Sequence, residues 1–399
     1  MLTKIQLDKY ADLMIAALYS CRNEKYQRGD IIQVSFDPAA IRLAEIIQGK
    51  LLDLGMNPIV KQLPSPTMEH NFYSKANRNQ IVFVDPGKKE LCRHLNGHIV
   101  LWAVESLTHL KDVDPRKIGK ARVAHKFLKD IVDKREEQGE FGWTLCSLPT
   151  EECAKKAGLT LRQYTNQIIK ACYLNEENPV QVWKKTERQI KKTINWLNNL
   201  PIIALHIESA NIDLEIALGR KRQWRGGGGA NIPSLEIFVS PDWRGTRGVY
   251  YSDLPTYRSG NYLEKIRLEF INGRVAQATA KKGEKFLRTQ LAMDKGAAQI
   301  GEFSLTDKRF SKIDKFMAEM LYDENFGGKH GNCHLAVGSS YSDTFAGNQA
   351  SLTKEKKKSL GFNDSALHWD LVNTERKRVT AILKGGGKMI IYENGIFLN

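Results

Sequence analysis

The sequence of 399 residues lacks the features of membrane-inserted and secreted proteins. No apolar run approaches the length of about 18 residues that a membrane-spanning helix needs. Residues 1–20, MLTKIQLDKYADLMIAALYS, carry charges among their apolar side chains, so they predict an amphipathic helix rather than a signal peptide. The six cysteines are scattered without the spacing of a disulfide framework. These absences favour a cytoplasmic protein with reduced thiols.

Signatures of nucleotide and nucleic-acid binding are also missing. No G-x-G-x-x-G opens the first predicted helix and no G-x-x-x-x-G-K-[ST] occurs. A nucleotide site is therefore supported only by the predicted fold and by no sequence motif. The net charge of +15 is typical of nucleic-acid-binding proteins, but Lys and Arg are spread along the whole chain, with short clusters at 184–192, 219–225 and 354–358. No zinc finger, aromatic ribonucleoprotein motif or helix-turn-helix accompanies them. Nucleic-acid binding is therefore an alternative, not the expected function.

One stretch contains metal-binding residue types without the spacing of a structural site. CRHLNGH offers Cys92, His94 and His98, but no second cysteine pair follows at zinc-finger spacing. We therefore do not assign a metal to this stretch.

The first half of the chain alternates between strand and helix patterns. Helices are predicted at 40–55 and 116–137, and strands at 31–36, 58–63, 81–84 and 98–104. This order predicts a mostly parallel sheet flanked by helices. Three further helical stretches, 151–158, 161–174 and 179–200, complete this half.

The second half is dominated by short strand-like segments separated by Gly, Asn and Asp turns. Helices are predicted at 284–295 and 311–324, and a terminal hairpin turns at Glu393-Asn394-Gly395. The fold class is therefore α/β, with an N-terminal α/β domain (1–195) and a C-terminal α+β metal-binding domain (196–399).

Ionisable side chains interrupt several apolar strands of the second half. In SALHWDLV, His368 and Asp370 stand two residues apart, so both point to one face of a strand while Trp369 points to the other. Burying a carboxylate beside an imidazole is costly without compensation. Residues of the same kind occur in IPSLEIFVSP, AAQIGEFSLTD and YDENFGGKHGNCHLAVGSSY, namely Glu236, Glu302, Glu324 and His334.

A shared metal site explains this set better than separate buried charges do. Three Glu, one Asp and two His are ligand types that zinc, cobalt and manganese accept. Carboxylates a few ångströms apart raise one another's pKa, so the set does not remain ionised without cations. Two divalent ions about 3.5–4 Å apart, bridged by a carboxylate, form the two-metal site found in many hydrolytic enzymes.

These stretches resemble the metal-binding segments of the thermophilic-type metallo-aminopeptidases, the family of aminopeptidase T, aminopeptidase S and PepS. The resemblance rests on NIPSLEIFVSP, IGEFSL, YDEN followed by an insert and HLAVGSSY, and SALHWDLV, taken in this order. It extends back to FGWTLCSLPT (141–150) and NPVQVWKK. Such proteins are two-domain cytosolic peptidases, commonly dimeric, with a two-metal site in the C-terminal domain.

The resemblance implies roles for seven residues. The metal ligands would be Glu236, Glu302 as the bridge, Glu324, His334, His368 and Asp370, and Tyr341 would assist catalysis. The loop between Glu324 and His334 is longer than the spacing usual in the family, so His330 competes with Glu324 for the same ligand position.

The expected activity is release of N-terminal residues from short peptides by a water that two ions (Zn, Co or Mn) activate. Tyr341 would hydrogen-bond the developing oxyanion, and Glu302 would carry a proton to the leaving amine. RGGGGAN (225–231) would form a flexible loop at the mouth of the site. The expected partners are a peptide substrate and a second copy of the chain. A two-metal phosphoesterase and a basic nucleic-acid-binding protein are the alternatives.

Overall fold

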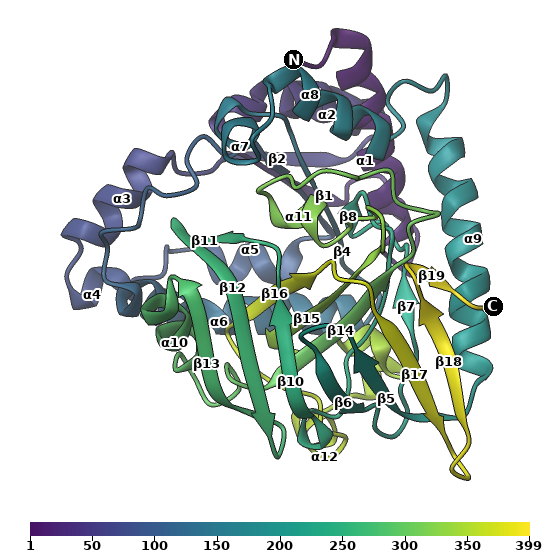
Figure 1. Ribbon diagram of the computed structural model, residues 1–399. Coiled ribbons are helices and arrows are strands. Elements are labelled where there is room, and N and C mark those ends of the chain that lie inside the picture. Colours follow the sequence, from purple (N-terminus) through teal and green to yellow (C-terminus); the bar gives the residue numbers. More distant parts are fainter.

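The computed structural model describes residues 1–399 and contains three β-sheets. The first sheet is parallel and the other two are antiparallel, so the predicted mixed α/β class is confirmed. Figure 1 follows the chain from the helices around the parallel sheet to the antiparallel strands. None of the helices combines the length and the apolar character that crossing a membrane requires.

The parallel sheet has the strand order β2-β1-β3-β4-β8. Its strands are β1 (Ile31–Phe36), β2 (Asn57–Gln62), β3 (Gly97–Trp102), β4 (Gly142–Ser147) and β8 (Asn231–Ile232). Burial alternates along β3, as expected for a strand whose two faces meet different surroundings. The predicted strands at 31–36, 58–63 and 98–104 are thus confirmed.

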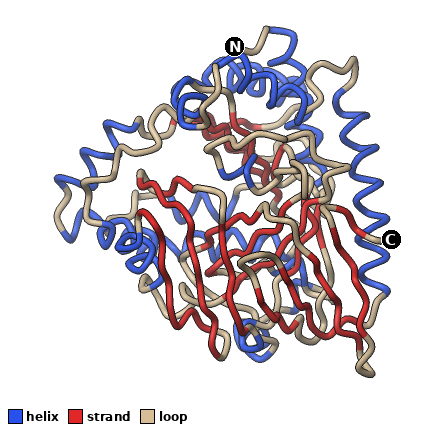
Figure 2. Tube along the Cα trace, viewed as in Figure 1, coloured by secondary structure: helices blue, strands red, loops and turns tan.

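Most helices of the first half lie close to their predicted positions, whereas α4 and α5 were not predicted. They are α1 (Lys4–Ser20), α2 (Ile41–Asp53), α3 (Pro66–Lys75), α4 (Arg78–Ile81), α5 (Lys88–His94), α6 (Pro115–Glu137), α7 (Glu151–Lys156), α8 (Leu161–Ala171) and α9 (Pro179–Asn199). Thr3 caps α1 through a reciprocal bond with Gln6, and Asp114 caps α6 ahead of Pro115. Figure 2 shows α9 along one side of the molecule, where it contacts α1 and β7.

The predicted strand at 81–84 is wrong. Asn77 and Gln80 form a capping box at the start of the short helix α4, which covers Arg78–Ile81. The chain turns directly after this helix. Val82 and Phe83 are exposed, so this apolar run is a surface turn, and β3 occupies the position in the sheet beside β1.

Two antiparallel sheets form most of the second half. The larger has the order β11-β12-β10-β6-β5-β17-β18-β19, with β13 beside β12, and the smaller has the order β16-β15-β14-β9-β7. The larger contains β5 (Ile202–Glu208), β6 (Asp213–Ala217), β10 (Arg247–Ser252), β11 (Thr256–Arg258), β12 (Asn261–Ile271), β13 (Arg274–Lys282), β17 (Arg378–Leu383), β18 (Lys388–Glu393) and β19 (Ile396–Phe397). The smaller contains β7 (Arg225–Gly226), β9 (Glu236–Val239), β14 (Ile300–Thr306), β15 (Asn332–Gly338) and β16 (His368–Asn373). The terminal hairpin is confirmed, because β18 pairs with β19.

The remaining helices are short: α10 (Glu284–Leu291), α11 (Met320–Asp323) and α12 (Lys354–Ser359). The predicted helix at 311–324 is therefore wrong except for its last turn. Ala318 has a positive φ of 53°, and the Asp323 carboxylate accepts hydrogen bonds from the backbone N–H groups of Met317 and Glu319. These bonds replace helical ones, because a side chain that captures backbone donors competes with the helix.

Segments beyond residue 200 also pack into the core of the parallel sheet. Ile232 of β8 and the buried side chains of Ile313, Met317 and Tyr322 belong to the same apolar cluster as β1 and β3. The division into domains near residue 195 stays a prediction.

Candidate metal centre

The ionisable residues of the smaller antiparallel sheet share one of its faces. Along its strands, Ile237, Phe303, Leu335 and Trp369 point into the apolar core that the two antiparallel sheets share. The neighbouring residues point the other way because side chains alternate along a strand. Those neighbours are Glu236 on β9, Glu302 on β14, His334 on β15, and His368 and Asp370 on β16.

Strand register brings these residues together although they are far apart in the sequence. Glu302 and Asp370 both lie opposite Ala336 of β15, on its two sides. His334 lies opposite Ser304, and His368 lies opposite Gly338. Glu236 lies opposite Thr306, so it is the residue of the group furthest from Glu302 along the strand direction.

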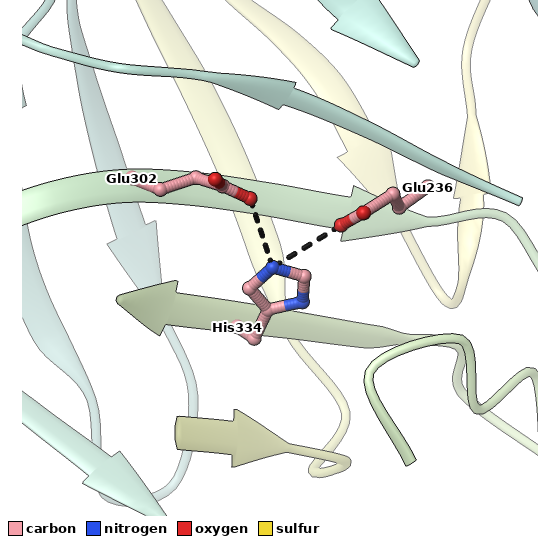
Figure 3. Close-up of side chains that lie close together, drawn as sticks. All are labelled: Glu236, Glu302 and His334. Carbon is pink, nitrogen blue, oxygen red and sulfur yellow. Dashed lines mark hydrogen bonds and ion pairs between the residues drawn. The ribbon is translucent and has the colours of Figure 1, made fainter. Parts of the chain in front are cut away.

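His334 lies between two buried glutamates (Figure 3). Its Nε2 atom is 3.1 Å from Oε2 of Glu236 and 3.1 Å from Oε1 of Glu302. One atom from each of these three residues can be chosen so that all lie within 4.8 Å of one another. Ser304, which shares their face, donates to Oε2 of Glu236 at 2.8 Å.

A second pair of residues lies on the other side of Glu302. Nε2 of His368 is 3.8 Å from Oε2 of Glu302 and 3.3 Å from Oδ1 of Asp370. The other ring nitrogen, Nδ1, donates to the backbone carbonyl of Ser339 at 2.8 Å, which directs Nε2 toward the carboxylates. A histidine held through one nitrogen so that the other is free is the usual arrangement of a metal ligand.

Glu324 reaches the same group from the end of α11. Its Oε1 atom accepts a hydrogen bond from Asn231 at 2.8 Å, and only 6% of the residue is exposed. Burial raises its pKa well above the usual value, and the charges of Glu236 and Asp370 raise it further. His330 is partly exposed, and the charges that act on it come from lysines such as Lys329 and Lys377 and not from these carboxylates. The structure brings Glu324, and not His330, to the carboxylate group.

Tyr341 follows β15 and covers the histidine side of the group. Its ring lies 4.7 Å from the ring of His368 and 5.9 Å from that of Phe238, measured between centroids. Burial raises the pKa of its phenol well above the usual value, and the Glu302 charge adds to this effect. The hydroxyl therefore keeps its proton at neutral pH and can donate a hydrogen bond.

All seven predicted site residues line one cavity of about 1560 Å³. Its walls come from α6 and α9 of the first half and from the small antiparallel sheet of the second. The cavity is larger than the range of about 300–1000 Å³ that is common for small-ligand sites. It has room for a substrate larger than a single amino acid.

The carboxylates of the site have no lysine or arginine ion-pair partner. Glu236, Glu302 and Asp370 make ion pairs only with the two histidines, and Glu324 makes none. Burial raises the pKa of Glu236 to about 7 and that of Glu302 to about 8, whereas His368 holds the pKa of Asp370 below its usual value against the effect of burial. Three buried carboxylates, the partly exposed Asp370 and two imidazoles with so little compensation fit divalent cations.

Three supporting residues were missed by sequence reasoning. Asn231 and Ser304 bond the glutamates directly, and Arg258 donates to the backbone carbonyl of His368 at 2.8 Å. Ser304 was detectable in principle, because it stands two residues after Glu302 and therefore on the same face of the strand. Nothing in the local sequence of Asn231 or Arg258 indicated their positions.

The glycine-rich segment lines the cavity and is packed closely against its neighbours. A Cβ atom on Gly226 would lie 2.1 Å from the backbone oxygen of Glu236, and one on Gly229 would lie 3.1 Å from Ala17. Gly226 pairs with Ile237 of β9, so its small size allows the strand that carries Glu236 to approach. The segment 225–231, which was expected to be a flexible loop, is therefore closely packed at Gly226 and Gly229.

Gly226→Ala should destabilise the protein by about 2 kcal/mol, because the methyl group meets backbone and φ is +151°. Chemical denaturation monitored by circular dichroism measures this. Gly228→Ala is the matched control, since no atom lies within 4 Å of its Cβ position and the expected change is within roughly 0.5 kcal/mol. Equal effects of the two substitutions would contradict the packing argument.

Comparison with known proteins places this site in a family. The family model described as thermophilic metalloprotease (M29) matches residues 3–397. Aminopeptidase PepS of Streptococcus thermophilus is 26% identical, with 98% of each chain covered, and aminopeptidase AmpS of Bacillus subtilis (strain 168) is 28% identical, with 77% and 78% covered. The solved structure of wild-type AmpT from Thermus thermophilus has the same fold, with a TM-score of 0.79 and 21% identity over 99% of each chain.

Proposed function

The chain belongs to the thermophilic metalloprotease (M29) family, and on that premise we propose that it is a metal-dependent aminopeptidase that releases N-terminal residues from short peptides. The observation that carries the proposal is the convergence of six ligand-type side chains and Tyr341 in one cavity. Neither alternative, a phosphoesterase or a nucleic-acid-binding protein, receives support from the relatives.

The proposed ligands of two divalent ions are the six side chains of the carboxylate group: Glu236, Glu302, Glu324, His334, His368 and Asp370. Glu302 is the proposed bridge, because its Oε1 faces His334 and its Oε2 faces His368. Zinc, cobalt and manganese all accept this set of oxygen and nitrogen donors.

The ions, when bound, supply Lewis acidity, which polarises a carbonyl and makes water a stronger acid. The Tyr341 hydroxyl is placed to donate a hydrogen bond to the carbonyl oxygen of the substrate as negative charge develops there. The Glu302 carboxylate is the proposed carrier of the proton from the attacking water to the leaving amine.

The shape of the cavity supports short peptides as substrates. Helices α6 and α9 border it on one side and the small antiparallel sheet on the other, so we expect short peptides to reach its floor more readily than folded proteins. We also propose a homodimer, from the resemblance to the family, and light scattering on the purified protein tests this. The cytoplasmic location stays a prediction.

Removal of metal should abolish peptidase activity. We expect hydrolysis of leucyl-p-nitroanilide to fall to background after dialysis against a chelator, and to return on addition of Zn²⁺, Co²⁺ or Mn²⁺. The same additions should raise the unfolding temperature, because an ion that binds only the folded chain stabilises it. Undiminished hydrolysis by protein that elemental analysis shows to be free of transition ions would contradict the proposal.

A further inference from the structure

An aminopeptidase has to recognise the α-ammonium group of its substrate, and the six proposed metal ligands are committed to the ions. Another anionic group on the cavity wall is therefore required, unless an ion itself binds the amine. Carboxylates are the natural partners, because a hydrogen bond from a charged N–H to a carboxylate is about twice as strong as a neutral one.

Most other carboxylates of the cavity already have close partners. Each of five carboxylates forms an ion pair with at least one lysine. The pairs are Asp133 with Lys129 (2.5 Å), Glu187 with Lys191 (2.8 Å), Asp364 with Lys126 (2.7 Å), Asp130 with Lys126 and Lys354, and Glu137 with Lys357. Glu136 accepts a hydrogen bond from Trp143, and burial raises its pKa to about 8, so it is mostly neutral at pH 7.

Asp343 is the exception among these cavity residues. Its Oδ1 atom is shielded from solvent and has no hydrogen-bond partner. Its only ion-pair contact is a long one, 3.8 Å from Oδ2 to Nε of Arg225. Although Oδ1 itself is shielded, the side chain as a whole is 38% exposed and lines the cavity.

The position of Asp343 relative to the metal centre is suitable. It lies in the short 3-10 helix η3 (Ser342–Thr344), directly after Tyr341. Burial raises the pKa of Asp343 and the charge of Arg225 lowers it, and the negative charge of Asp343 in turn contributes to the raised pKa of Glu302. An ammonium group beside Asp343 would therefore lie in the cavity that Tyr341 and Glu302 also line.

The backbone that carries Asp343 is firmly held. Gln223 donates to the carbonyl of Asp343 at 2.8 Å, and Ser342 donates to Glu137 of α6 at 2.8 Å. Thr344 donates to the carbonyl of Tyr341 at 2.9 Å. A carboxylate on a fixed turn binds a ligand with less loss of conformational entropy than one on a mobile loop does.

We propose that Asp343 binds the α-ammonium group of the peptide and so restricts the enzyme to substrates with a free N-terminus. The inference rests on the proposed aminopeptidase function. It assigns substrate recognition, and not a step of bond cleavage, to Asp343.

The test compares two substrates that differ only in the amine, leucyl-p-nitroanilide and 4-methylpentanoyl-p-nitroanilide. For metal-loaded wild-type protein, kcat/KM for leucyl-p-nitroanilide should exceed that for 4-methylpentanoyl-p-nitroanilide by roughly 30-fold or more. This factor corresponds to the lower end of the range expected when a charge pair loses one partner, because Asp343 is partly exposed. Asp343→Asn should remove most of this ratio by slowing the leucyl substrate and leaving the other unchanged. Competitive inhibition by L-leucine should weaken by a similar factor, whereas inhibition by 4-methylpentanoate should not change.

Asp133→Asn is the matched control, because Asp133 lines the same cavity with 36% of its side chain exposed but is paired with Lys129. It should keep the wild-type ratio, and metal content by elemental analysis should be equal in all three proteins. An unchanged ratio in Asp343→Asn, or an equal loss in Asp133→Asn, overturns the inference. Failure of the wild-type protein to cleave either substrate would instead contradict the proposed function.

Discussion

Glu302→Gln should lower kcat by about 10³-fold or more while the protein remains folded. The carboxylate faces His334 with one oxygen and His368 with the other, so glutamine removes charge from both halves of the proposed two-metal site. It also removes the group proposed to carry the proton, and general acid–base catalysis contributes up to about 10⁴-fold. Steady-state hydrolysis of leucyl-p-nitroanilide at saturating metal measures the loss.

The fold should tolerate this substitution, because glutamine has nearly the same shape and volume as glutamate. Glu319→Gln is the matched control: Glu319 is also buried, burial raises its pKa to about 8 as it does for Glu302, and it does not line the cavity. Its kcat should stay close to wild type. Substantial retained kcat in Glu302→Gln would remove Glu302 from the centre of the mechanism.

Tyr341→Phe should lower kcat by about 10²–10³-fold with a much smaller change in KM. The hydroxyl is proposed to bond the oxygen that becomes negative in the transition state, and loss of one such donor costs about 3 kcal/mol. The ring contacts with His368 and Phe238 are kept by phenylalanine, so the packing of the site is expected to be retained. Steady-state kinetics separate the two parameters.

Tyr251→Phe serves as the control, because Tyr251 lies on β10 outside the cavity, and its kinetics should match those of wild type. If Tyr341→Phe has unaltered kcat, the tyrosine contributes packing only. If it alters KM and kcat/KM by the same factor at constant kcat, the hydroxyl binds the ground state instead.

Local sequence patterns were sufficient for most elements of the fold. The alternation of strands and helices from 31 to 137 predicted the parallel sheet, since each crossover helix has its own 3.6-residue period. The failures at 81–84 and 311–324 have physical causes. Val82 and Phe83 are apolar residues left at the surface, and Asp323 captures the backbone groups that a helix would use.

The site residues were accessible from the sequence for a similar reason. His368 and Asp370 stand out because charged residues interrupt an apolar strand, and period-two alternation places them on one face. Glu324 was ambiguous because it lies at a helix end before a long loop, where no period exists. The choice between it and His330 became visible only when Asn231 and the carboxylates were seen around it.

The sequence alone determined which residue types are available and which face of each strand carries them, because backbone geometry sets alternation locally. It thereby predicted a carboxylate and imidazole set fit for divalent ions. Tertiary structure alone decided how β9, β14, β15 and β16 are ordered, and hence that Glu302 lies between His334 and His368. It also decided that Asp343, paired only loosely with Arg225, faces the same cavity. Such relations depend on strand pairing and packing between residues that are far apart in the sequence, which no local period encodes.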